Sequence, residues 1–383
     1  MATEPLVPRS ESELCHMIAE ASRRGERLAI RGGNSKGGIG RPTPQARDLD
    51  MRAFDGVVDY DPPELVLTVR PATPLATVQS LVAEQGQMLA FEPFDHGPIF
   101  GRSTGAATIG GVVAAAVAGS QRVASGGARD HLLGVRAVSG RGELFISGAK
   151  VVKNVTGYDL PKLIAGSWGR LSAITELTLK VLPAPRVMAT RVIRGLDPDR
   201  AVAAMAAAMG SQAEIAAAAH WPANGGITAF RLQGFHASVA ARCANLMRFL
   251  EPFGRLDAVD DDEAAMLWTG MVTLASLPQD LPLWRVIMPP GAGGKLVGEL
   301  ERHGAQWLLD WAGGLAWIAL GGEEDIVRAA AAAVGGHALL VRAPPDLRDR
   351  VAAFHPPHPG VAALEERVRR AFDPAMVFET GRF

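Results

Sequence analysis

Two glycine-rich segments, about 75 residues apart, constrain this chain most. The first, Arg-Gly-Gly-Asn-Ser-Lys-Gly-Gly at residues 31–38, directly follows a predicted strand at residues 28–31. The second, Thr-Ile-Gly-Gly at residues 108–111, stands where a predicted short helix over residues 112–117 opens. Glycine lets a backbone approach a ligand closely, and N–H groups after a strand or at a helix start can hold an anion. Both segments fit a diphosphate site. The alternative for the first is a flexible surface loop, and for the second it is tight helix packing through small residues, which would not exclude binding.

Neither segment has the spacing of the common nucleotide-binding loops. A Walker A loop needs Gly-Lys followed by Ser or Thr, and a Rossmann turn needs Gly-x-Gly-x-x-Gly. Neither pattern is present at these positions. A different nucleotide-binding fold is therefore expected.

Charge and hydropathy exclude several classes of partner. The 39 basic and 40 acidic side chains nearly cancel, which argues against binding to nucleic acid or to an anionic membrane surface. Apolar runs such as residues 112–118 and 329–334 are much shorter than the roughly 20 residues that span a bilayer. Glu4 and Pro5 stand where a signal peptide would carry basic and apolar residues. We expect a soluble cytoplasmic protein with a small neutral or anionic ligand.

The cysteines argue against a metal cluster. Cys15 and Cys243 are far apart in sequence and do not have the spacing of a zinc or iron–sulfur site. Such sparse use suits a reducing compartment. Both are expected to be small buried apolar residues.

The chain length and the pattern of predicted strands and helices indicate two domains. A single core rarely grows past about 250–300 residues, and this chain has 383. A long alternating strand at residues 174–182 ends at Pro-Ala-Pro, residues 183–185. Strand and helix units then follow over residues 187–250 and recur over residues 284–341, as two ferredoxin-like halves would. The expected fold is α+β, with an N-terminal domain at 1–185, a cap at 186–345 and a C-terminal segment, 346–383, that returns to the first domain.

Two local elements are predicted in more detail. Residues 10–24 have the apolar spacing of an amphipathic helix, and Ser10 with Glu13 matches a capping box. Gly-Arg-Gly-Glu at residues 140–143, between two apolar runs, predicts a β-hairpin.

Further blocks give the glycine pattern its specificity. Residues 126–130 read Gly-Gly-Ala-Arg-Asp, residues 153–160 read Lys-Asn-Val-Thr-Gly-Tyr-Asp-Leu, and residues 166–169 read Gly-Ser-Trp-Gly. In this order after the two glycine-rich segments, the blocks resemble the FAD-binding domain of the p-cresol methylhydroxylase and vanillyl-alcohol oxidase superfamily. The resemblance covers roughly residues 5–185.

That resemblance implies FAD as the cofactor and assigns residues to it. Residues 31–36 and 108–111 would hold the diphosphate from two sides, and residues 154–157 would lie near the isoalloxazine ring. Arg129 and Asp130 would lie by the flavin-binding wall, and residue 174 would present its backbone to the adenine end. The expected cofactor-binding residues are Arg31, Gly32, Gly33, Asn34, Ser35, Lys36, Thr108, Ile109, Gly110, Gly111, Arg129, Asp130, Asn154, Thr156, Gly157, Gly166, Gly169 and Ile174.

One departure from the superfamily bears on how the cofactor is held. Many members attach FAD covalently through a histidine in the first loop, and this chain has Asn34 where that histidine would stand. Non-covalent FAD is therefore expected.

The C-terminal sequence narrows the resemblance to the FAD-binding subunits of bacterial glycolate oxidases. Phe-His-Pro at residues 354–356 and the closing residues 372–382 resemble those subunits, which usually end on Phe-Asn-Pro-Gly-Arg. Here Glu379 and Thr380 replace Asn and Pro. This chain therefore lacks the asparagine through which the resemblance would imply a contact with the flavin ring.

The catalytic machinery of related hydroxy-acid dehydrogenases is missing from the sequence. Their His-x-Gly-Asp-Gly-Asn-x-His metal segment does not occur within residues 186–383. His355 and His358 are separated by two prolines that prevent a helix from bringing them together, so structural roles are favoured over a metal site. We can assign no catalytic residue and expect no metal.

The resemblance therefore implies an accessory subunit. Its partners would be a catalytic flavoprotein subunit and an iron–sulfur subunit of a complex that oxidises glycolate, a small 2-hydroxy acid, to glyoxylate. The chain would be peripheral to the inner membrane through these partners and would bind no nucleic acid. A self-sufficient FAD-dependent oxidoreductase of a 2-hydroxy acid or alcohol, and a non-catalytic structural subunit, are the alternatives.

Overall fold

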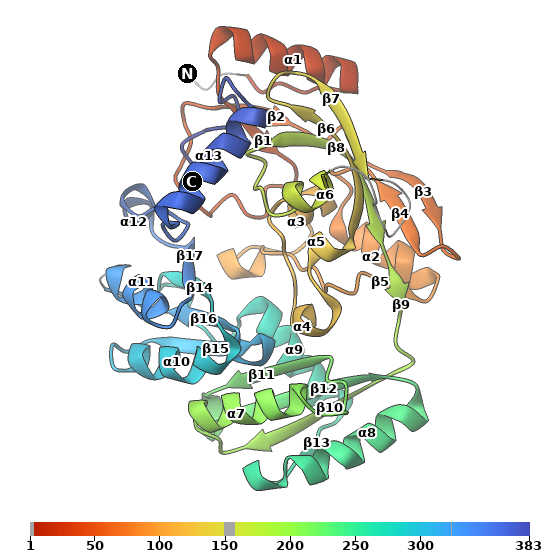
Figure 1. The fold of residues 1–383 in the computed structure, drawn as a ribbon, viewed down its shortest axis with the longest axis vertical. Coiled ribbons are helices and arrows are strands. Elements are labelled where there is room, and N and C mark those ends of the chain that lie inside the picture. The colour runs from red at the N-terminus through yellow and green to blue at the C-terminus, as the bar shows by residue number, and fades with distance from the viewer. Residues whose placement is uncertain (1–3, 149–157, 323) are drawn as a thin grey trace.

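The computed structural model describes residues 4–148, 158–322 and 324–383. The expected mixed fold of helices and sheets is confirmed, with a five-stranded antiparallel sheet in the N-terminal half and an eight-stranded antiparallel sheet in the C-terminal half (Figure 1). Within these described ranges, no helix combines the length and the hydropathy that crossing a bilayer requires.

The N-terminal half is built on three sheets. A parallel pair, β1 and β2, lies beside the five-stranded sheet of order β3-β4-β8-β6-β7, and β5 pairs with β9. The strands are β1 (Leu28–Arg31), β2 (Arg47–Asp50), β3 (Val57–Asp61), β4 (Val66–Val69), β5 (Gln87–Met88), β6 (Leu132–Ser139), β7 (Leu144–Gly148), β8 (Ser172–Lys180) and β9 (Leu182–Pro183). The helices are α1 (Glu11–Arg24), α2 (Leu75–Glu84), α3 (Ile109–Ala114), α4 (Arg122–Ser125), α5 (Ala128–His131) and α6 (Leu160–Ile164).

The two local predictions are confirmed with one change. The Ser10 side chain accepts from the N–H of Glu13 at 3.2 Å, as a capping residue should. The Glu13 carboxylate, however, accepts from the N–H of Arg9 at 2.8 Å, one residue before the cap. The hairpin joins β6 to β7 through residues 140–143.

The C-terminal half repeats one β-α-β-β-α-β unit, which is the element order expected of a ferredoxin-like half. The strand orders are β13-β10-β12-β11 and β15-β16-β14-β17, and β11 pairs with β15 to join the units. The first unit comprises β10 (Val187–Arg194), α7 (Pro198–Met209), β11 (Ala217–Trp221), β12 (Ile227–Gly234), α8 (His236–Phe249) and β13 (Asp257–Ala258). After α9 (Asp261–Thr273), the second comprises β14 (Leu283–Ile287), α10 (Gly293–Glu301), β15 (Gln306–Asp310), β16 (Leu315–Ala319), α11 (Glu324–Ala333) and β17 (His337–Arg342).

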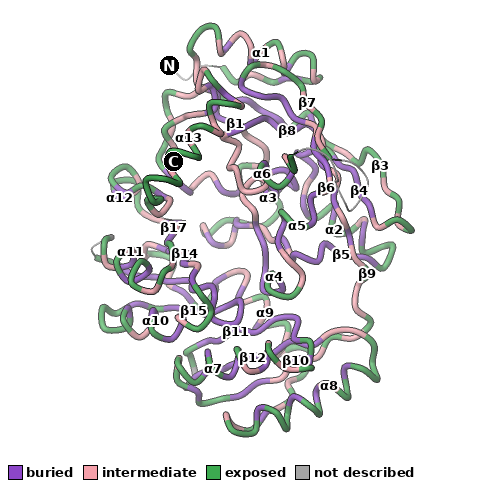
Figure 2. The backbone as a smooth tube through the Cα atoms, viewed as in Figure 1, coloured by how far each residue is buried: buried purple, intermediate pink, exposed green. Residues whose placement is uncertain are grey.

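The eight-stranded sheet is buried on both faces, as Figure 2 shows for its central strands. On one face it packs against α7, α8, α10 and α11 in the largest hydrophobic core. On the other face Trp311 and Trp317 pack with α9 and with N-terminal residues such as Ile39 and Ile99. The sheet therefore presents one face directly to the N-terminal half.

The last residues pack against the N-terminal half. After α12 (Pro345–Arg350) and α13 (Pro359–Phe372), the N–H of Leu28 donates to the carbonyl of Val377 at 2.8 Å. Asp373 turns this segment by accepting from the N–H groups of Val377 and Phe378, at 2.8 and 2.7 Å. The carboxyl-terminal residues are thereby placed beside β1 and the first glycine-rich loop.

Both cysteines are free. Cys243 is buried in the core of the first cap unit, as predicted, whereas Cys15 is only half-buried on α1.

Candidate functional site

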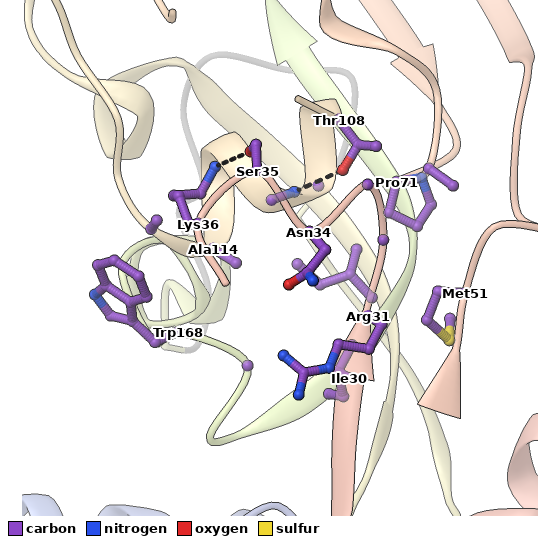
Figure 3. Close-up of a pocket in the computed structure, with 18 of the residues that line it drawn as sticks. Ile30, Arg31, Asn34, Ser35, Lys36, Met51, Pro71, Thr108, Ala114 and Trp168 are labelled. Atoms are coloured by element: carbon purple, nitrogen blue, oxygen red, sulfur yellow. Dashed lines mark hydrogen bonds between the residues drawn. The ribbon is translucent and has the colours of Figure 1, made fainter. Parts of the chain in front are cut away.

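A recess opens between the loop after β1 and the start of α3 (Figure 3). The figure shows the side chains of Arg31 and Asn34 pointing into this space, with Trp168 across from them. About 850 Å³ between the lining atoms is unfilled, with the open mouth included. Without its open mouth, the cavity itself has a volume of about 130 Å³, so most of this space continues into solvent.

Glycines allow close contacts of the backbone at two places around the recess. A Cβ on Gly33 would lie 1.7 Å from the carbonyl oxygen of Ala106, and a Cβ on Gly110 would lie 2.4 Å from the Cβ of Pro71. Real side-chain atoms do not approach so closely. A side chain at Gly33 would therefore push the first loop away from Ala106, and one at Gly110 would push the start of α3 away from Pro71. This favours the close-approach interpretation of the first segment over that of a flexible loop. For the second segment, the contact of Gly110 with Pro71 fits the alternative of tight helix packing, which does not exclude a binding role.

The first loop presents free donors to the recess. The N–H groups of residues 33–36 donate to no other described residue, whereas the N–H of Gly37 donates to the carbonyl of Asn34 at 3.1 Å. Asn34 has a φ of 57°, a left-handed conformation that turns the loop. Successive unpaired N–H groups in such a turn form an anion-binding concavity.

Lys36 places a buried cation in the same loop. Its ammonium contacts the hydroxyl of the buried Ser35 at 3.2 Å and lines the recess. Burial lowers the pKa of Lys36 to about 8; Asp95 opposes the shift and Arg382 adds to it. A buried ammonium with one neutral partner is costly unless an anion completes its surroundings.

The second glycine-rich segment contributes less than its sequence predicts. The N–H groups of Ile109 and Gly110 already donate to the carbonyls of Thr73 and Pro71, at 3.0 and 2.8 Å. The N–H of Gly111 donates to the hydroxyl of its own cap, Thr108, at 3.3 Å. This segment therefore forms a wall of the recess, and most free donors come from the first loop.

The structure brings together most of the predicted cofactor-binding residues. Those that line the recess are Arg31, Gly32, Gly33, Asn34, Ser35, Lys36, Thr108, Gly110, Gly111, Gly169 and Ile174. Four predicted residues lie elsewhere: Ile109 is in the core, Arg129 and Asp130 are exposed on α5, and Gly166 lines a neighbouring groove. Asn154, Thr156 and Gly157 lie outside the described residues.

Several residues of the recess escaped the sequence interpretation. Trp168 lies within the Gly-Ser-Trp-Gly block, and Arg382 lies in the C-terminal Gly-Arg pair, so both stood inside motifs that had been noticed. Met51, Pro71 and Ser172 carry no such signal. The further lining residues are Ile30, Gly37, Ala72, Ala114 and Ala115.

Comparison with known proteins agrees with this geometry. Residues 5–148 match the family model of an FAD binding domain. The chain is 34% identical over 360 residues to the glycolate oxidase subunit GlcE of Escherichia coli K12, covering 93% of this chain and 92% of that protein. The chain belongs to the family of the glycolate oxidase subunit GlcE.

Two further proteins are similar to this chain, one over part of its sequence and one in its fold. The glycolate oxidase subunit GlcD of Bacillus subtilis 168 is 27% identical over 186 residues, which is 48% of this chain and 38% of that protein. The crystal structure of p-cresol methylhydroxylase with substrate bound superposes with a TM-score of 0.73 at 13% identity, covering 98% of this chain and 87% of that one. At that identity the likeness shows the shared fold alone.

The residues of the recess fit FAD, the cofactor of this family. Free N–H groups and the Lys36 ammonium suit a diphosphate, because phosphate oxygens take charge-assisted hydrogen bonds. Ile30, Met51 and Ile174 supply an apolar wall of the kind that a planar ring packs against. The two requirements of a dinucleotide cofactor are thus met in one recess.

Beyond the recess, buried polar contacts hold the cap sheet to the N-terminal half. The Ser120 hydroxyl and the Trp311 N–H both donate to the Asp310 carboxylate at 2.8 Å, and the Trp311 indole N–H donates to the carbonyl of Gly119 at 2.9 Å. Burial raises the pKa of Asp310 to about 7, against the effect of these hydrogen bonds. Two of these contacts join the eight-stranded sheet to residues 119 and 120 of the N-terminal half.

Proposed function

We propose that this chain is the FAD-binding subunit of a complex that oxidises glycolate to glyoxylate and passes the electrons through flavin to an iron–sulfur subunit. The similarity to GlcE over nearly the full length of both chains carries the proposal. The similarity to GlcD, another glycolate oxidase subunit, and the FAD binding domain support an FAD-dependent oxidoreductase.

The proposal assigns separate tasks to the residues of the recess. Bound FAD supplies the hydride-accepting chemistry, and the protein binds and orients it. The N–H groups of residues 33–36 and the Lys36 ammonium hold the diphosphate. The apolar wall that includes Ile30 and Ile174 holds the adenine end. Trp168 bounds the recess on the opposite side.

The partners and the location are part of the same proposal. A catalytic flavoprotein subunit would supply the groups that act on the 2-hydroxy acid, because a metal segment of the kind that catalytic relatives use is missing from the sequence of this chain. An iron–sulfur subunit would accept the electrons, since the two cysteines here cannot hold a cluster. The assembled complex would lie at the cytoplasmic side of the inner membrane.

Substrate-dependent reduction tests the proposed function. The purified chain is expected to carry flavin that does not bleach when glycolate is added anaerobically, and to show glycolate-dependent bleaching when the partner subunits are co-expressed. Absorbance of the flavin band, recorded with and without partners, decides between the two states. Rapid bleaching of the isolated chain would instead identify a self-sufficient oxidoreductase, and a colourless chain that takes up no added FAD would identify a structural subunit.

We further propose that FAD is held without a covalent bond. Asn34 occupies the loop position at which covalent relatives carry a histidine, and an amide does not form the flavin adduct. Denaturing the flavin-loaded protein should release essentially all of the flavin into the supernatant. Flavin fluorescence that remained with the protein band on a denaturing gel would contradict this.

A further inference from the structure

The guanidinium of Arg382 bridges two carbonyls of the first glycine-rich loop and of the residue that follows it. Its Nη2 donates to the carbonyl of Lys36 at 2.5 Å, and its Nε donates to the carbonyl of Ile39 at 2.8 Å. The carbonyl of Arg382 in turn accepts from the N–H of Arg41 at 2.9 Å. Arg382 therefore holds this stretch through both its side chain and its backbone, although it lies 346 positions after Lys36 in sequence.

These contacts fasten the turns that shape the loop. The N–H of Gly37 donates to the carbonyl of Asn34, and the N–H of Ile39 donates to the carbonyl of Lys36, each at 3.1 Å. Each hydrogen bond spans three residues, as in a β-turn, so the loop consists of successive turns. Arg382 binds the second turn at the carbonyls of its first and last residues. Its hydrogen bonds thus fix the part of the loop that carries the Lys36 side chain.

Aromatic packing keeps Arg382 beside the loop. Its guanidinium carbon lies 5.0 Å from the centroid of the Phe383 ring, within the range of a cation–π contact. Phe383 packs against Trp168 and Phe354, with ring centroids 5.2 and 4.7 Å apart. Trp168 lines the recess, as Arg382 does. The Arg382 side chain is therefore held between the loop on one side and an aromatic cluster on the other.

Arg382 also acts on the charge of the loop. Burial lowers the pKa of Lys36 to about 8, Asp95 opposes this shift, and the positive charge of Arg382 adds to it. His96, the other titratable group that faces Lys36, is neutral in this range because burial lowers its pKa well below the usual value. No carboxylate among the described residues forms an ion pair with Lys36 or with Arg382. Two such basic groups in one recess suit an anionic ligand.

We propose that Arg382 is a positioning residue of the cofactor site, which holds the first loop in the shape that binds the diphosphate. This inference rests on the proposed function in one respect, namely that FAD fills the recess. A loop that is ordered before FAD arrives spares the cofactor the entropy of ordering it, and affinity rises accordingly. Because the N–H groups of residues 33–36 and the Lys36 ammonium belong to that loop, Arg382 acts on FAD through them.

Two substitutions separate the shape of the loop from its charge. Arg382→Gln removes both the charge and the planar fork that reaches two carbonyls, whereas Arg382→Lys keeps the charge and loses the fork. Both should lower FAD affinity in fluorescence titrations of the FAD-free protein, Arg382→Gln by about tenfold, because charge-assisted hydrogen bonds that order the loop are lost. Only Arg382→Gln should move the fall of affinity to higher pH, because the pKa of Lys36 rises when its cationic neighbour is removed.

Arg348→Gln is the matched control for these variants. Arg348 donates to the carbonyl of Gly40 at 2.8 Å, just beyond Ile39, but it neither lines the recess nor shifts the pKa of Lys36. Its replacement should leave FAD affinity and the pH dependence of that affinity close to those of the wild type.

The outcomes separate the inference from the function on which it depends. Wild-type FAD affinity in Arg382→Gln would overturn the positioning role. An affinity that fell together with the unfolding temperature, with its pH dependence unchanged, would also overturn it and make Arg382 a structural residue. Either result would leave the glycolate oxidase proposal standing, because these titrations involve neither glycolate nor the partner subunits. Wild-type protein that took up no FAD would instead refute the proposed function, and the inference with it.

Discussion

Lys36→Met is expected to weaken FAD binding by roughly 10- to 150-fold. The variant keeps an unbranched apolar stem of similar shape but removes the terminal ammonium and its charge. Hydrogen bonds to charged groups contribute about 1.5–3 kcal/mol, which corresponds to that range of affinity. Titration of the FAD-free protein with FAD, followed by fluorescence quenching, measures the effect. Lys295→Met removes the same charge from an exposed position on α10 and should leave the affinity unchanged.

The same lysine makes FAD affinity depend on pH in one direction. With its pKa lowered to about 8 in the FAD-free protein, the Lys36 ammonium is charged below that pH and loses its proton above it. Since the diphosphate needs the charged form, affinity should fall as the pH rises above about 8, by up to about tenfold for each pH unit. In Lys36→Met this dependence should disappear. A variant that bound FAD as tightly as the wild type across this range would contradict the assigned role.

The expected effect of Lys36→Met on stability has the opposite sign to its effect on FAD affinity. Measuring both therefore distinguishes a role in binding from a role in folding. Burial makes the Lys36 ammonium unfavourable in the FAD-free protein, because no carboxylate among the described residues forms an ion pair with it. Removing it should therefore keep or raise the unfolding temperature of that protein while lowering its FAD affinity. A lysine with a merely structural role would lower both when replaced. Binding sites often retain such locally unfavourable groups because the ligand satisfies them.

The fold could be predicted from the sequence where interactions between residues close in sequence determine the structure. The cap of α1 at Ser10, the hairpin at residues 140–143 and the repeated strand and helix units of the second half all follow from short-range patterns. The first loop could also be predicted from the sequence, because a run of glycines after a strand has few structural uses. Its pairing with the second segment at Thr108 could be expected from the resemblance to a known order of motifs.

What the sequence missed depends on contacts between distant residues. Arg382 reaches the recess because the C-terminal segment returns to β1, more than 340 positions away in sequence. The N–H groups of Ile109 and Gly110 looked free in sequence, yet Thr73 and Pro71 supply acceptors to them from another loop. No short-range pattern could show that these donors were already used. The same limit applies to the neighbouring groove that Gly166 lines, whose walls come from separate segments of the chain.

Gly33→Ala should have the largest combined effect, on both stability and FAD binding. The added Cβ would lie 1.7 Å from the carbonyl oxygen and 2.8 Å from the carbonyl carbon of Ala106, and backbone atoms cannot rotate away as a side chain does. The loops would have to separate, at a cost of about 1–3 kcal/mol or more in the free energy of unfolding. The free N–H groups of residues 33–36 would move with them, so FAD affinity should fall by more than tenfold.

A second glycine, which has open space around it, serves as the control for Gly33→Ala. Gly298 lies in α10 with nothing within 4 Å of its added Cβ, so Gly298→Ala should stabilise the protein by about 0.4–1 kcal/mol and leave FAD binding intact. Gly110→Ala, whose Cβ would meet Pro71 at 2.4 Å, should resemble Gly33→Ala. Thermal unfolding and FAD titration of the three variants measure both effects. If Gly33→Ala and Gly298→Ala behaved alike, the close approach of the two loops would not be what shapes the recess, and its glycines would be serving flexibility instead.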